Sequence, residues 1–114
     1  MFINGDGEQT RDFTFIENVV QANIKAAFSN FNSHQVYNVA VGERISINIL
    51  WEKIKEITRS KVNIKYRESR IGDVRDSLAN IDKAKKQLVY LPEFKMDKGL
   101  EIAYNWHLNL NNKK

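Results

Sequence analysis

Two hydrophobic periods alternate along this chain, and their alternation restricts the fold more than any other feature. Residues 46–58 show the helical period, because apolar residues recur there every three or four positions behind a good N-cap at Ser46. Residues 35–41 and 62–66 instead alternate with the period of two that is typical of strands. Helices that alternate with strands indicate a small α/β chain whose few strands are expected to be parallel.

Three further helices are expected, over residues 19–28, 80–88 and 97–110. Asn18 is a suitable N-cap for the first of them, and Asn80 followed by an acid starts the second. The chain therefore predicts about four helices and few short strands. This order is that of a small α/β subdomain that packs on something larger.

Length and composition restrict the class of protein. The 114 residues fit one domain, and the apolar share of 42% is ordinary for a globular protein. Cysteine is absent, which excludes disulfides, thiolate metal sites and a cysteine nucleophile. Neither a signal peptide nor an apolar run of membrane-spanning length occurs, so we expect a cytoplasmic protein without a membrane partner.

The distribution of charge and the positions of the histidines and tryptophans favour structural roles over nucleic-acid or metal binding. The net charge of +4 is not gathered on one face, so no nucleic-acid partner is expected. His34 and His107 lack a second ligand at metal spacing, which predicts no metal site and partly buried, structural histidines. Trp51 and Trp106 lie at helical core spacing, which predicts packing.

The first stretch that carries chemistry runs from Gly5 to Asn18. The turn signal Gly5-Asp6-Gly7 precedes Arg11 and Asp12, and residues 13–16 have the aromatic and β-branched character of a short extended segment. An arginine held by a rigid turn, strand and helix start is well placed to bind an anion. The alternative is a solvated Arg11–Asp12 surface pair.

The second stretch is Arg70-Ile71-Gly72-Asp73. An arginine can fork onto phosphate oxygens, a glycine permits close backbone approach, and an aspartate can accept hydrogen bonds from two vicinal hydroxyls. Together these residues suit a nucleoside diphosphate. The alternative is a screened surface network of the arginines and acids between residues 67 and 76.

The residues that connect the two stretches are, in order, Gly5-Asp6-Gly7, Arg11-Asp12-Phe13, Asn18, Val36-Tyr37-Asn38-Val39, Gly42, Arg70-x-Gly72-Asp73, Ser77, Lys83-Ala84 and Leu88-x-Tyr90-x-Pro92. This ordered set resembles the C-terminal part of the extended short-chain dehydrogenase/reductase family. Within that family it is most similar to nucleotide-sugar 4-epimerases, particularly those acting on UDP-N-acetylhexosamines. The resemblance covers essentially the whole chain.

The resemblance implies substrate-binding roles for four residues. Arg11 and Arg70 match the arginines that reach the diphosphate of the UDP-sugar, and Asp73 matches the carboxylate that contacts the uridine ribose. Ser77 matches a residue on the wall of the sugar pocket, where a small side chain leaves room for an N-acetyl group. The departure from the family pattern is that Asn18 and Asn80 stand where many relatives carry aspartate.

Two family features are missing from the chain. It has no GxxGxxG motif for NAD, and no tyrosine is followed by lysine four positions later. Together with the abrupt start at Met1, this predicts that residues 1–114 are the C-terminal nucleotide-sugar-binding subdomain of a longer NAD-dependent UDP-N-acetylglucosamine 4-epimerase. We expect no catalytic residue, bound NAD or turnover in this chain alone. By the same resemblance, the whole enzyme is expected to form a homodimer through helices outside this chain.

Two alternatives remain open at this point. One is the same fold in another nucleotide-sugar enzyme, such as a 4,6-dehydratase, a decarboxylase or a hexuronate epimerase. The other is a stand-alone basic interaction module.

Overall fold

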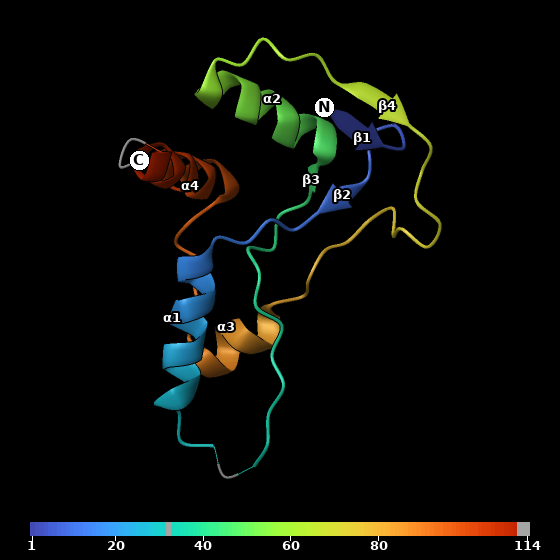
Figure 1. Cartoon of the computed structure of the whole chain (residues 1–114). Coiled ribbons are helices and arrows are strands. Elements are labelled where there is room, and N and C mark those ends of the chain that lie inside the picture. Colours follow the sequence, from blue (N-terminus) through green and yellow to red (C-terminus); the bar gives the residue numbers. More distant parts are fainter. Residues whose placement is uncertain (32, 112–114) are drawn as a thin grey trace.

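The structure, a computed structural model, describes residues 1–31 and 33–111 (Figure 1). Its four helices and short strands confirm the predicted α/β class for this part of the chain. In chain order the elements are β1 (Phe2–Asn4), β2 (Thr10–Arg11), α1 (Ile16–Ala27), β3 (Ile45–Ser46), α2 (Ile47–Thr58), β4 (Lys65–Arg67), α3 (Asp82–Leu88) and α4 (Met96–Asn111).

The strands form two separate pairs. β1 and β4 are parallel, with Ile3 opposite Tyr66, whereas β2 and β3 are antiparallel, with Thr10 opposite Ser46. The expectation of parallel strands is therefore confirmed for the first pair and wrong for the second. Figure 1 shows both pairs on the same side of the molecule as α2, with α1 and α3 on the opposite side.

Three of the expected extended segments differ from the structure. Residues 35–41 form no strand in the described part, because no neighbouring strand pairs with them and their carbonyls instead accept side-chain donors such as Lys83 Nζ on Val36 O at 2.9 Å. Residues 13–15 are irregular, and the regular pairing lies earlier, in β2. The strand expected at 62–66 begins later, in β4.

The predicted N-cap at Ser46 is confirmed, whereas α3 begins at Asp82, two residues after Asn80, with Ile81 at its N-cap. Ser46 Oγ accepts a hydrogen bond from Ile49 N at 3.2 Å and caps α2, and Asn80 Oδ1 accepts one from Asp82 N at 2.9 Å at the start of α3. Asn18 is not an N-cap. α1 begins two residues earlier, and the Asn18 side chain is buried against a distant segment.

The main apolar core lies between α1, α3 and the irregular segment that precedes Gly42. Tyr90 is its largest buried side chain, and its hydroxyl donates to Ala40 O at 2.8 Å. Burial, reinforced by the negative charge of Asp12, raises the pKa of Tyr90. The core consists of Ala22, Ala40, Ile81, Ala84, Leu88 and Tyr90.

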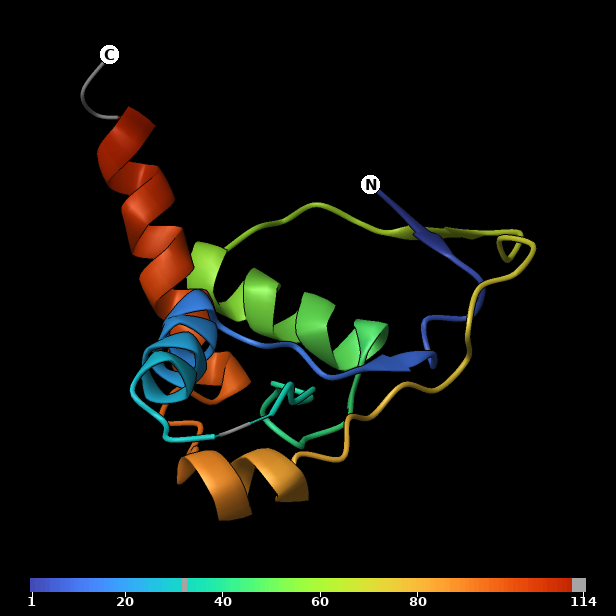
Figure 2. The same ribbon diagram turned by 90° about the horizontal axis from the view of Figure 1, so that it is seen from below.

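The two tryptophans have different environments. Trp51 is buried in α2, as predicted, but Trp106 is 58% exposed and His107 is also exposed, so the predictions of packing for Trp106 and of partial burial for His107 are wrong. The cause is the direction of α4. Its first half packs near α2, and its second half projects from the body of the molecule (Figure 2).

The described chain is thin and extended. Its radius of gyration is 17.0 Å, whereas a compact domain of this length has about 13 Å. Several large apolar side chains are exposed, among them Ile16, Val20 and Ile24 on α1 and Phe28 directly after it. None of the helices described here is both long and apolar enough to cross a membrane.

Candidate functional site

Backbone hydrogen bonds bring the two predicted stretches together at β2. On one side β2 pairs with β3. On its other side, Thr10 N donates to Arg75 O at 2.8 Å and Ser77 N donates to Thr10 O at 3.2 Å. The loop over residues 70–77 therefore lies directly beside Arg11, although more than 60 residues separate them in the sequence.

The guanidinium of Arg11 is held on two of its nitrogens. Nη2 forms an ion pair with Asp73 Oδ1 at 2.5 Å, while Nη1 donates to Thr10 O at 2.7 Å and to Arg75 O at 3.3 Å. The side chains of Arg11 and Asp73 are 28% and 37% exposed, so both remain accessible to a ligand. The structure thus brings together two of the four residues predicted to bind the substrate.

Asp12 does not pair with Arg11, so the alternative of a solvated Arg11–Asp12 pair is wrong. The two carboxylate oxygens of Asp12 accept hydrogen bonds from Val41 N at 3.0 Å and Gly42 N at 2.9 Å. Asp12 therefore fixes the backbone next to Arg11 against the segment that leads into β3. The neighbouring arginine is left free to face the 70–77 loop.

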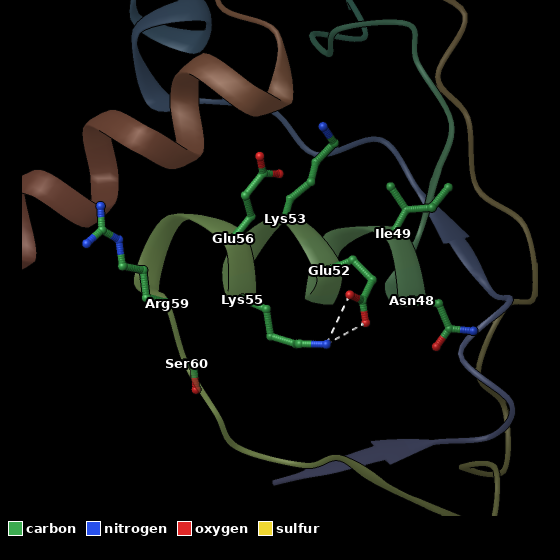
Figure 3. Close-up of a pocket in the computed structure, with 8 residues that line it drawn as sticks. All are labelled: Asn48, Ile49, Glu52, Lys53, Lys55, Glu56, Arg59 and Ser60. Atoms are coloured by element: carbon green, nitrogen blue, oxygen red, sulfur yellow. Dashed lines mark hydrogen bonds and ion pairs between the residues drawn. The ribbon is translucent and has the colours of Figure 1, made fainter.

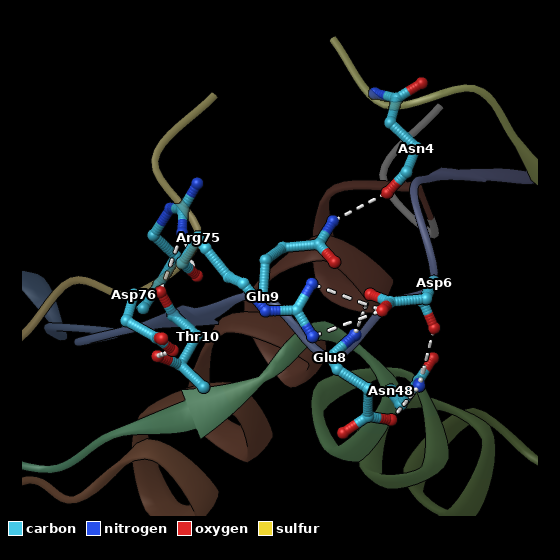
Figure 4. A network of polar contacts seen from close by, with 9 residues as sticks. Asn4, Asp6, Glu8, Gln9, Thr10, Asn48, Arg75 and Asp76 are labelled. Carbon is cyan, nitrogen blue, oxygen red and sulfur yellow. Dashed lines mark hydrogen bonds and ion pairs between the residues drawn. The ribbon is translucent and has the colours of Figure 1, made fainter. Parts of the chain in front are cut away.

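The Gly5-Asp6-Gly7 turn forms as predicted, with both glycines at positive φ, +72° and +77°. Asp6 Oδ1 accepts a hydrogen bond from Glu8 N at 2.9 Å, and Asp6 Oδ2 accepts two from the terminal nitrogens of Arg75, each at 3.2 Å (Figure 4). The bond from Glu8 N, together with Arg75, lowers the pKa of the Asp6 carboxyl. The turn is thereby tied to the loop that carries Asp73.

Asn48, in the first turn of α2, fixes the other side of this turn. Its amide nitrogen donates to Asp6 O at 3.1 Å and to Glu8 Oε1 at 2.6 Å (Figure 4). Its Oδ1 accepts a hydrogen bond from the Tyr66 hydroxyl at 3.0 Å. A Cβ on Gly7 would lie 2.0 Å from Asn48 Oδ1, so this approach requires glycine. Sequence reasoning missed Asn48, since only the turn glycine hinted that something lies close by.

Arg70 and Ser77 lie on the same loop without joining the ion pair. Asp73 N donates to Arg70 O at 3.1 Å across a turn whose Gly72 has φ +82°, so Arg70 and Asp73 share one tight turn. Both Arg70 and Ser77 are exposed. In the part of the chain that the structure describes, neither side chain makes a hydrogen bond or ion pair.

Cavities near these residues differ in size and chemistry. A polar cavity of about 80 Å³ is lined by Asp73 and Arg75 together with the glycine turn. A larger one, of about 700 Å³, lies along α2 and contains none of the predicted site residues (Figure 3). Its wall is the charged face of α2, where Lys55 pairs with Glu52 at 3.1 Å. Chemistry therefore places the candidate site at the loop, despite the smaller volume there.

The described residues include no cluster suited to a metal ion and no turn of the kind that binds a dinucleotide. Within residues 1–31 and 33–111, no three His, Asp or Glu side chains gather closely enough to hold a metal ion. No described strand passes through a glycine-rich turn directly into a helix, the arrangement that holds a dinucleotide diphosphate, because the Gly5–Gly7 turn leads into β2.

Comparison with known proteins gives consistent matches. Residues 1–103 match the family model described as GDP-mannose 4,6 dehydratase. The UDP-glucose 4-epimerase of Thermotoga maritima, solved with UDP-glucose, is 33% identical with a TM-score of 0.90, over 96% of this chain and 35% of that one. The UDP-glucuronic acid 4-epimerase of Bacillus cereus, solved with UDP-glucuronic acid and NAD, is 30% identical with a TM-score of 0.88, over the same shares of 96% and 35%.

A third similar structure is the UDP-N-acetylglucosamine 4-epimerase of Methanobrevibacter ruminantium, solved with UDP-N-acetylmuramic acid. It is 36% identical with a TM-score of 0.86, over 96% of this chain and 34% of that one. The chain spans about a third of the length of the curated relatives it matches. The family match over residues 1–103 and these structures show that the chain belongs to the NAD-dependent epimerase/dehydratase family, the extended short-chain dehydrogenases/reductases.

Proposed function

We propose that residues 1–114 are the nucleotide-sugar-binding part of a UDP-sugar 4-epimerase that uses NAD. The observation that carries this proposal is the arrangement of Arg11 and Asp73, which come from distant stretches and meet at 2.5 Å beside the tight turn of Arg70. An arginine on β2, together with an arginine and a carboxylate on a neighbouring glycine-containing loop, suits a nucleoside diphosphate. The UDP-sugars bound by the similar structures support the same class of ligand.

In this proposal the chain supplies binding and orientation. Arg11 and Arg70 hold the diphosphate, and Asp73 accepts hydrogen bonds from the ribose hydroxyls. These contacts are remote from the reacting carbon of the sugar. Their binding energy orients the substrate, so that the sugar lies where the chemistry occurs. NAD would supply the hydride chemistry, from outside the residues described here.

The proposed substrate is an N-acetylhexosamine joined to UDP. This finer assignment rests on Ser77, whose small side chain leaves space that a bulky aromatic would fill. A 4,6-dehydratase is the second candidate function, because the matching family model carries that description. The two activities differ in their product, since only the dehydratase releases a 4-keto-6-deoxy sugar.

The experiment joins this chain to the NAD-binding part of the Thermotoga maritima relative, in place of the third of that protein that it matches. We expect the joined enzyme to bind UDP and to epimerise a UDP-sugar. The 114-residue chain alone is expected to give no turnover and no tight NAD binding. A joined enzyme that folds and binds NAD but shows no affinity for UDP would refute the proposal, and a 4-keto-6-deoxy product would favour the dehydratase.

A further inference from the structure

Asp73 occupies one edge of the Arg11 guanidinium. Its Oδ1 lies 2.5 Å from Arg11 Nη2, and the two carbonyls of Thr10 and Arg75 hold Nη1. A carbonyl is neutral, so the carboxylate of Asp73 is the one full negative charge that these contacts place on the guanidinium. Any anion that approaches Arg11 must displace this carboxylate or accept its repulsion.

The cost of displacing Asp73 depends on what else the ligand carries. A nucleoside diphosphate brings a ribose, whose two vicinal hydroxyls can donate hydrogen bonds to the released carboxylate. An inorganic diphosphate brings no donor of this kind, so Asp73 would lose its partner without replacement. The pair therefore penalises a bare phosphate anion more than a nucleotide.

We propose that Asp73 is a specificity-determining residue that makes Arg11 reject diphosphates lacking a ribose. This inference rests on the proposed function of the site and adds to it a role for the carboxylate against competing anions. Partial exposure keeps the Arg11–Asp73 pair exchangeable, since neither side chain is locked in the core. Ligand binding then replaces one ion pair by two interactions, phosphate on Arg11 and ribose on Asp73.

Asp76 provides a matched control. It lies on the same loop and carries the same charge, but its Oδ1 accepts a hydrogen bond from the Thr10 hydroxyl at 2.7 Å and does not contact Arg11. Asp76→Asn therefore removes one negative charge near the site without freeing the guanidinium. Asp73→Asn and Asp73→Ala remove the carboxylate charge that pairs with Arg11. The alanine variant also removes the hydrogen-bond acceptor.

The experiment measures the affinities of the 114-residue chain for inorganic pyrophosphate and for UDP by NMR titration. We expect both Asp73 variants to bind pyrophosphate about two- to fivefold more tightly than the wild type, the range for a partly exposed ion pair. UDP should bind to them about tenfold more weakly, because the ribose loses a charged acceptor. Asp76→Asn should change both affinities less than twofold.

The outcomes separate this inference from the proposed function. If the Asp73 variants bind pyrophosphate no more tightly than Asp76→Asn does, the specificity role is overturned whatever happens with UDP. If the wild type shows no saturable UDP binding, the proposed function fails, while the pyrophosphate comparison still reports on the ion pair.

Discussion

Asn18 holds both backbone polar groups of Phe94. Its Nδ2 donates to Phe94 O at 2.7 Å, and its Oδ1 accepts from Phe94 N at 3.1 Å and also from Glu93 N at 3.0 Å. The side chain is only 1% exposed. One buried amide thereby joins α1 to the partly buried segment that leads into α4.

Asn18→Ala is expected to reduce the free energy of unfolding by about 2 kcal/mol, because it leaves the partly buried backbone groups of Glu93 and Phe94 without their side-chain partner. Urea unfolding followed by circular dichroism measures this change. Asn23→Ala, an exposed position of the same helix, is the control and should stay within about 0.5 kcal/mol of the wild type. Equal stabilities of the two variants would show that the buried amide contributes nothing.

Gly99 in α4 is expected to resist substitution even by alanine. A Cβ there would lie 2.7 Å from Phe15 Cβ, and this clash is expected to outweigh the helix propensity of alanine, with a net loss of about 1 kcal/mol. Thermal unfolding of Gly99→Ala and of Asn105→Ala, on the exposed part of the same helix, makes the comparison. A rise in stability for Gly99→Ala would contradict the close packing of α4 on Phe15.

The free energy of unfolding is expected to depend on pH through the Asp6 carboxyl. Its folded pKa lies below its ordinary value of 3.8, chiefly because Glu8 N donates to its carboxylate and also because of Arg75. A lowered folded pKa gives a stabilisation that is fully present above about pH 4 and is lost as the pH falls through the lowered pKa. Asp6→Asn should therefore be less stable than the wild type at pH 7, and the difference should shrink toward pH 3.

Urea midpoints at a series of pH values measure this difference, and Glu101→Gln, an exposed acid of α4, provides the reference for losing one charge. A difference between wild type and Asp6→Asn that is the same at pH 3 and pH 7 would show that the turn does not depend on the ionised carboxylate.

Ser77→Tyr tests the substrate proposal in the joined enzyme. A tyrosine would fill the space proposed for the N-acetyl group, so kcat/KM for a UDP-N-acetylhexosamine should fall at least tenfold more than kcat/KM for the unsubstituted UDP-hexose. Ser77→Ala keeps the volume small and serves as the control. Equal losses on both sugars for Ser77→Tyr would remove the N-acetylhexosamine assignment.

Local signals explain which parts of the fold were predictable from sequence. The roles of Ser46 and Trp51 are predictable, because a cap and a helical apolar face depend on neighbours within a few residues. The role of Asn18 is not predictable from its neighbours, because its partners Glu93 and Phe94 lie more than 70 residues away and outweigh local capping. Residues 35–41 have strand-like alternation but no neighbouring strand in the described chain, and a strand requires one.

The candidate site also combines features that are predictable from local sequence with features that depend on long-range contacts. The residue types at Arg11, Arg70 and Asp73 indicated a diphosphate from their chemistry, and the order of motifs indicated the family. The ion pair between Arg11 and Asp73 and the bond of Arg75 to Asp6 could not be predicted, because both depend on the pairing of β2 with a loop far along the chain. Sequence alone specified the groups, and the tertiary fold determined their partners.

The most direct test of the central claim is to map the UDP site on the 114-residue chain by NMR, comparing the wild type with Arg70→Ala and with Arg44→Ala, an exposed arginine outside the loop. Saturable shifts are predicted at Arg11, Asp73 and Ser77, with affinity lost more than tenfold in Arg70→Ala and retained in Arg44→Ala. Shifts centred on the α2 cavity, or equal affinities for the two variants, would contradict a nucleotide-sugar site at this loop.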